Sequence, residues 1–87
     1  MNLRKLRIKM IKKGDIIRGS ELEEKGLEVF VSKEGLGMLK SEKEKAFYDV
    51  VVFKSNDEVK YQVFGIYKSS ILYNFFNRMY EKRNKNE

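Results

Sequence analysis

The stretch from residue 46 to residue 66 constrains the fold most, because it carries the pattern of a β-hairpin. Two runs rich in β-branched and aromatic residues, Ala46–Lys54 and Glu58–Ile66, are separated by Ser55-Asn56-Asp57. A two-residue turn at Asn56 and Asp57 would pair residues whose numbers add up to 113. The sequence therefore predicts a hairpin of two long strands with this register.

The two faces of the predicted hairpin differ in polarity. One face is uniformly apolar and is expected to lie in the core; it holds Tyr48, Val50, Val52, Val59, Tyr61 and Val63. The other face mixes apolar and polar side chains; it holds Phe47, Asp49, Val51, Phe53, Lys60, Gln62, Phe64 and Ile66. We expect this second face to be partly exposed or partly covered by another layer.

A helix is predicted over residues 69–83. Ser69 or Ser70 can cap its first turn. Apolar side chains recur at the spacing i, i+3, i+4, i+7, which is the spacing of one helix face; they are Leu72, Phe75, Phe76 and Met79. We expect this stripe to pack on the hairpin, flanked by Tyr73, Asn77 and Tyr80.

The first half of the chain carries weaker signals for short elements. Residues 5–11 fit a strand, although a helical stripe fits them too. A turn at 13–15, an extended piece at 16–17, a helical turn at 21–25 between Ser20 and Gly26, a strand at 27–32 and a glycine turn at 33–37 follow. The predicted fold is a single α+β domain over residues 1–87, with a small antiparallel sheet of three to five strands packed by the C-terminal helix.

The 87 residues contain no histidine and no cysteine. This composition removes the commonest general base and the commonest thiol nucleophile, and with them most metal-ligand sets and catalytic triads. We therefore predict a binding protein that is not an enzyme, with no metal site, no cofactor and no catalytic residues.

Positive charge is concentrated at both ends of the chain. The net charge is +6; residues 1–19 carry seven basic residues against one acidic residue, and residues 67–87 carry five against two. Such polarised charge is typical of nucleic-acid binding, which is the favoured function. The predicted phosphate contacts are Arg4, Lys5, Arg7, Lys9, Lys12, Lys13, Arg78, Lys82 and Arg83, and the candidates for base stacking are Tyr67, Tyr73 and Tyr80.

Protein binding is the alternative function. The mixed face of the hairpin offers an apolar surface to a partner protein or to a second copy, and its candidate interface residues are Phe47, Val51, Phe53, Phe64 and Ile66. The small size is typical of inhibitors and accessory proteins of phages and mobile elements. A histidine-free RNA-cleaving toxin is a distant third hypothesis.

No apolar run reaches the length of a membrane span, and no apolar segment of a secretory signal follows the basic first residues. We therefore expect a cytoplasmic protein without a membrane partner.

Overall fold

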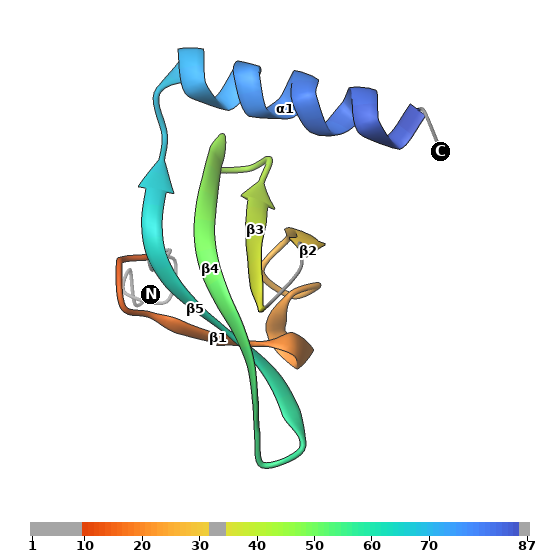
Figure 1. Cartoon of the computed structure of the whole chain (residues 1–87). Coiled ribbons are helices and arrows are strands. Elements are labelled where there is room, and N and C mark those ends of the chain that lie inside the picture. Colours follow the sequence, from red (N-terminus) through yellow and green to blue (C-terminus); the bar gives the residue numbers. More distant parts are fainter. Residues whose placement is uncertain (1–9, 32–34, 86–87) are drawn as a thin grey trace.

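The computed structural model describes residues 10–31 and 35–85, which form an antiparallel sheet of five strands and a C-terminal helix (Figure 1). The elements are β1 (Ile16–Arg18), a 3-10 helix η2 (Gly19–Glu21), β2 (Leu27–Val31), β3 (Leu36–Ser41), β4 (Ala46–Ser55), β5 (Glu58–Tyr67) and α1 (Ser70–Lys85). The strand order is β1-β5-β4-β3-β2. The predicted α+β class is confirmed. The strand predicted at 5–11 lies outside the described residues except for Met10 and Ile11, which belong to no strand.

The predicted hairpin and most of its register are confirmed. Strands β4 and β5 pair from Ser55 with Glu58 through to Val50 with Val63, so each pair of numbers adds up to 113. The two turn residues, Asn56 and Asp57, have φ angles of 56° and 65°. Two successive left-handed residues give the turn whose twist matches that of paired strands, and asparagine tolerates this conformation better than most residues do.

Replacing Asp57 by glycine should stabilise the fold by about 0.5–1 kcal/mol, because glycine adopts a positive φ without steric cost. Thermal unfolding followed by circular dichroism would measure the change. Asp57→Ala is the matched control, since it removes the same carboxylate but keeps a Cβ atom. A gain of equal size in both variants would contradict the turn geometry as the cause.

A bulge interrupts the hairpin register beyond Val50. Asp49 pairs with Gly65 and Tyr48 pairs with Ile66, so strand β5 carries one extra residue. Glycine suits the bulge, since a Cβ atom on Gly65 would lie 2.9 Å from Oδ2 of Asp49 and would force that side chain to shift. The prediction that Ile66 lies on the mixed face is wrong, because the extra residue turns its side chain to the core face, where it packs against the main cluster.

The core lies on the predicted apolar face of the curled sheet. Leu39 and Val50 have no exposed surface, and Tyr48 and Val63 are 1% exposed. The buried cluster draws on all five strands; its members are Ile17, Leu27, Leu39, Ala46, Tyr48, Val50, Tyr61 and Val63. This cluster holds the curled sheet together on one side, and the mixed face lies on the other side of the sheet.

The helix α1 crosses one end of the sheet, away from the tip of the β4–β5 hairpin (Figure 1). The hydroxyl of Ser69 accepts a hydrogen bond from the backbone N–H of Leu72 at 3.1 Å, as expected of a helix cap. In the described part of the chain, no helix combines the length and the apolar character that crossing a membrane requires.

The side of α1 that packs on the sheet differs from the predicted stripe. Tyr73 is buried and Phe76 and Tyr80 are half-buried, whereas the exposed side chains are Leu72 at 40%, Phe75 at 57% and Met79 at 36%. The side of the helix that carries Tyr73 and Tyr80 packs on the sheet because its polar atoms also find partners there. Asn77, on the same side, accepts a hydrogen bond from Nζ of Lys40, and the hydroxyl of Tyr80 lies 3.3 Å from the sulfur of Met38.

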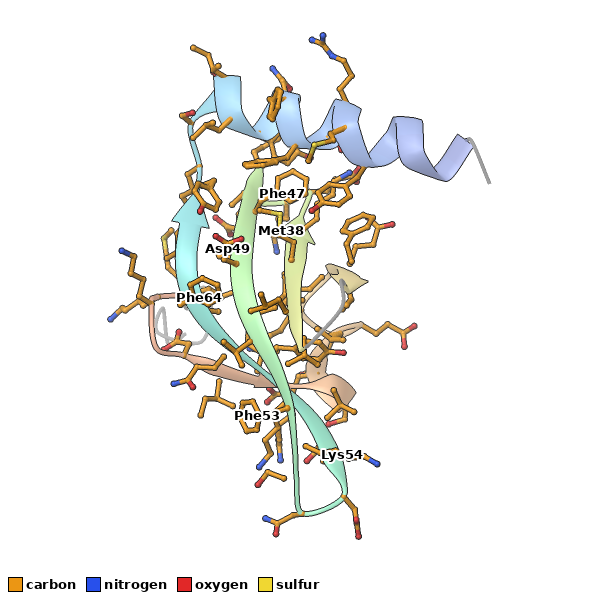
Figure 2. All side chains as sticks on the ribbon, viewed as in Figure 1. Met38, Phe47, Asp49, Phe53, Lys54 and Phe64 are labelled. Carbon is orange, nitrogen blue, oxygen red and sulfur yellow. The ribbon has the colours of Figure 1, made fainter. Side chains whose placement is uncertain are left out.

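Helix α1 covers only one end of the mixed sheet face. Phe47, a predicted interface residue, has no exposed surface because the helix rings of Tyr73 and Phe76 lie over it. Val51 and Phe64 remain 39% and 50% exposed, and Phe53 is half-buried; Figure 2 labels Phe47, Phe53 and Phe64 along this face. Phe47 is therefore covered by the helix and Ile66 lies on the core face, so neither is exposed on the predicted interface.

The segment between β1 and β2 also differs in detail from the prediction. The 3-10 helix η2 begins before Ser20, whose hydroxyl donates to a carboxylate oxygen of Glu58 at 2.9 Å and so does not act as the predicted cap. The end of the turn agrees with the prediction: Gly26 has a φ of 67°, and the backbone N–H of Leu27 donates to the carbonyl of Leu22 at 2.9 Å.

Strand β3 begins inside the predicted glycine turn. Leu36 and Gly37 already pair with Val51 and Val50 of β4, so only Gly35 among the described residues of that segment is in a turn. The pairing extends the sheet over Leu36, whose side chain is 46% exposed on the mixed face.

Candidate nucleic-acid interface

The part of the mixed sheet face that α1 leaves uncovered carries a row of cross-strand neighbours. Ile16 of β1 pairs with Gln62 of β5, and Gln62 pairs in turn with Val51 of β4. Leu36 of β3 continues the row beyond Val51. Ile16 is 51% exposed, and the ring of Phe64 on β5 is exposed beside the row. We call this surface the open face; apart from Gln62 its groups are apolar or aromatic, and a ligand could reach them.

Basic side chains lie along the side of the sheet formed by β1 and β5. The backbone of the segment before β1 is tied to β5, since the N–H of Gly14 donates to the carbonyl of Val63 at 2.7 Å. The last pair between β1 and β5 places Arg18 beside Lys60. Near the other end of β5, Nζ of Lys68 lies 4.0 Å from the sulfur of Met10. These elements assemble what we call the basic strip, made of Lys12, Lys13, Arg18, Lys60 and Lys68.

The strip keeps an excess of positive charge despite two carboxylates beside it. Glu21 accepts a hydrogen bond from the backbone N–H of Arg18 at 3.1 Å and forms an ion pair with its guanidinium at 3.3 Å. The backbone hydrogen bond, with the guanidinium beside it, lowers the pKa of Glu21 below its usual value. Asp15 accepts a hydrogen bond from the backbone N–H of Lys12 at 2.9 Å. The strip thus has five basic side chains beside two carboxylates, and both carboxylates already accept hydrogen bonds.

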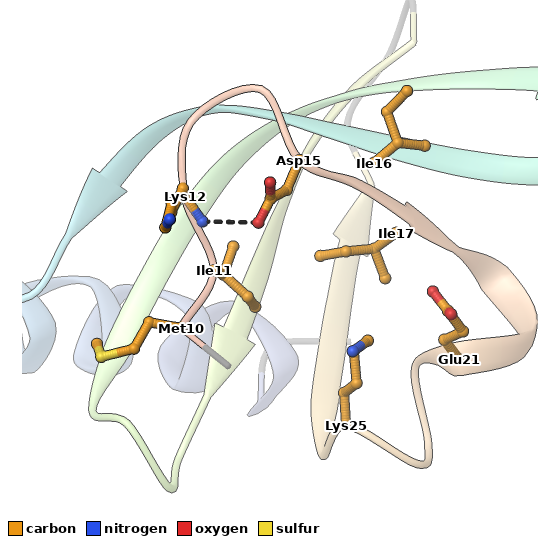
Figure 3. Close-up of a pocket in the computed structure, with 8 residues that line it drawn as sticks. All are labelled: Met10, Ile11, Lys12, Asp15, Ile16, Ile17, Glu21 and Lys25. Atoms are coloured by element: carbon orange, nitrogen blue, oxygen red, sulfur yellow. Dashed lines mark hydrogen bonds between the residues drawn. The ribbon is translucent and has the colours of Figure 1, made fainter. Parts of the chain in front are cut away.

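A hollow of about 400 Å³ lies beside the segment that leads into β1 (Figure 3). Apolar side chains and both signs of charge line it: Met10, Ile11, Lys12, Asp15, Ile16, Ile17, Glu21 and Lys25. Its two carboxylates are those of Asp15 and Glu21, whose partners are described above. Within the described residues, no three potential metal ligands come together.

The structure brings together only part of the predicted basic set. Lys12 and Lys13 are exposed in the strip, whereas Arg78 is exposed on α1, which packs at the opposite end of the sheet from β1. Lys82 and Arg83 lie in the last turns of α1. The remaining predictions, Arg4, Lys5, Arg7 and Lys9, lie outside the described residues.

The three tyrosines predicted to stack on bases are packed between helix and sheet. Tyr73 is 6% exposed, and the ring of Tyr80 stacks on Phe30 with centroids 4.5 Å apart. Tyr67 packs against Phe76 and donates its hydroxyl hydrogen to Asp49. That hydrogen bond, followed by burial, raises the pKa of Tyr67, so its phenol stays neutral at physiological pH. These three rings are therefore largely covered, whereas the ring of Phe64 on the open face is 50% exposed.

Three members of the strip were absent from the predicted basic set. The pairing of β1 with β5 brings Arg18 beside Lys60, and Lys68 lies near Met10. The available signal was weak: Lys60 and Gln62 are two of the polar positions of the mixed face, and Arg18 follows the extended Ile16-Ile17 piece.

No protein-family model matches the chain, and comparisons with curated proteins and with solved structures find no significant match. The chemistry of the open face and of the basic strip therefore carries the functional interpretation.

Proposed function

We propose that this protein binds single-stranded nucleic acid along the basic strip, without catalysing a reaction. The ring of Phe64 carries the proposal, because it is 50% exposed and lies midway in sequence between Lys60 and Lys68. An aromatic ring among cations supports both stacking on a base and contact with the neighbouring phosphates.

The length of the strip suits a short stretch of nucleic acid. Lys68 follows the last residue of β5 and lies eight positions after Lys60, which corresponds to about 26 Å of extended backbone at roughly 3.3 Å per residue. Binding sites of comparable sheet domains cover about 4–16 nucleotides. Single strands are favoured over duplexes because the bases of a duplex are already stacked on one another and are not free to stack on Phe64.

Five phosphate contacts should make binding strongly dependent on salt. For a single strand, the logarithm of affinity should fall with the logarithm of salt concentration with a slope of about −3.5, or about 100-fold between 50 and 200 mM. Fluorescence anisotropy with labelled single-stranded DNA, RNA and duplex probes of equal length would measure it.

The outcomes of this titration separate the candidate functions. Binding of single strands above duplexes, with the RNA probe recovered intact, supports the proposal. No binding of any probe at 50 mM salt would refute it and leave protein binding as the alternative. Shortening of the RNA probe during incubation would instead favour the RNA-cleaving hypothesis.

A further inference from the structure

A second aromatic ring lies on the same sheet face as Phe64, nearer the tip of the β4–β5 hairpin. Phe53 of β4 is half-buried, and it shares the mixed face with the exposed Val51 because alternate residues of a strand point the same way. Figure 2 labels both rings, with Phe64 nearer α1 and Phe53 nearer the tip. The face that bears the proposed site therefore presents two rings, and the proposed function uses one of them.

Basic side chains stand beside Phe53 in one cross-strand row. Phe53 pairs with Lys60 of β5, and Lys60 pairs in turn with Arg18 of β1. Side chains directly opposite one another in such a row have Cβ atoms about 5 Å apart. Arg18 also forms the ion pair with Glu21 described above, so we assign the phosphate beside Phe53 to Lys60. Phe53 thus combines a ring with a neighbouring cation, as a nucleotide contact requires.

The register sets the separation of the two rings. Phe64 lies four residues after Lys60, and the pairing from Lys60 to Val63 is regular. Four residues span about 13 Å of strand, and neighbouring strands lie about 4.8 Å apart, so the Cα atoms of Phe53 and Phe64 are about 14 Å apart. Stacked bases along one strand of a duplex are only about 3.4 Å apart. Two neighbouring bases therefore cannot cover both rings.

The hairpin tip limits the site beyond Phe53. Asp57 lies in the turn, and Glu58 begins β5 and accepts a hydrogen bond from the hydroxyl of Ser20. These carboxylates repel phosphates, whereas Lys60 on the other side of them attracts phosphates. A nucleic acid that follows the basic strip from Lys68 thus reaches Phe53 as its last ring before the tip.

We propose that Phe53 stacks on a second base of the same strand, so that the site holds two separated bases, one on each ring. This inference rests on the proposed function, because it describes how the same site engages its ligand. Once one base is held, the other stays close to its own ring at a high effective concentration. The sugar-phosphate units between the two bases cross the row of Gln62 and Val51, which lies between the rings.

Labelled DNA strands of about ten sugar-phosphate units, abasic except for one or two adenines, test this site. All these probes carry the same charge, so differences in affinity report the bases alone. Two adenines about four positions apart should bind about tenfold more tightly than one if the strand keeps the 3.4 Å rise of stacked bases, and an extended strand reaches this gain at a smaller separation. Neighbouring adenines should gain only about twofold, because either base can use one ring.

Variants of the two rings connect this gain to the proposed positions. Phe53→Leu removes the aromatic ring but keeps a large apolar side chain, and it should reduce the tenfold gain to about twofold. Phe64→Leu should do the same, because one remaining ring holds only one base. Val59→Ala is the matched control: Val59 is 37% exposed on the same hairpin but points to the other sheet face, so the gain should persist. Circular dichroism confirms that each variant is folded.

Anisotropy titrations at about 50 mM salt distinguish the outcomes. Loss of the gain in both phenylalanine variants, with its retention in Val59→Ala, supports the two-ring site. A gain that survives Phe53→Leu, or a gain of no more than about twofold at every separation, would overturn this site while the binding of single strands remained. If an unmodified single strand also fails to bind, the proposed function itself is refuted, and the two-ring site with it.

Discussion

Replacing Phe47 by alanine should destabilise the domain by about 3–5 kcal/mol, which is a large part of the total stability of a small domain. Phe47 has no exposed surface, and it joins the sheet to three rings of α1. Its centroid lies 5.4 Å from those of Tyr73 and Phe76 and 5.9 Å from that of Tyr80. Truncation leaves a cavity at the place where helix and sheet meet. Urea unfolding followed by circular dichroism would measure the loss.

Phe64→Ala is the control for this measurement, because the same atoms are removed from the same sheet face. Phe64 is 50% exposed, so its truncation leaves no enclosed cavity and should cost about 1 kcal/mol or less. Equal losses in the two variants would mean that α1 does not depend on Phe47 for its position.

Reversing two charges of the basic strip should weaken nucleic-acid binding by about 30–100-fold at 50 mM salt. Lys13 and Lys68 are both exposed, so Lys13→Glu with Lys68→Glu should leave the fold intact. Two phosphate contacts become repulsive, and the slope of log affinity against log salt should fall from about −3.5 to about −2.1. Anisotropy titrations over the same salt range would show both changes.

The control for the strip is Lys43→Glu with Lys54→Glu. Both lysines are exposed and neither belongs to the strip, yet the pair changes the net charge by the same amount. This control should weaken binding by less than about fivefold through the general field of the protein. If the control pair weakened binding as much as the strip pair, binding would follow net charge and the strip would not be the site.

The parts of the fold that the sequence predicted are those set by neighbouring residues. The hairpin register follows from alternation on both sides of Asn56-Asp57, and the helix follows from its periodicity and its serine cap. The bulge was not predictable in this way, because it rests on contacts between strands. It needs Gly65 to leave room for the carboxylate of Asp49.

The packing side of α1 could not be read from hydropathy. Leu72 and Met79 are more apolar than Tyr73 and Tyr80, yet both sides of the helix carry large side chains. The choice depended on partners in the sheet, which accept a tyrosine ring and hydrogen-bond Asn77 at once. For the same reason, the charge pattern along the sequence could not show that Arg18 lies beside Lys60, which only the pairing of β1 with β5 reveals.

The strand order has a consequence for the route by which the chain folds. Strands β2 to β5 each pair with the next strand in sequence, so each step closes only a short loop. Strand β1 is the exception, because Ile16 must meet Gln62 across most of the domain. Contacts between residues so distant in sequence are slow to form. The edge that bears the basic strip should therefore assemble last, onto a meander that has already formed.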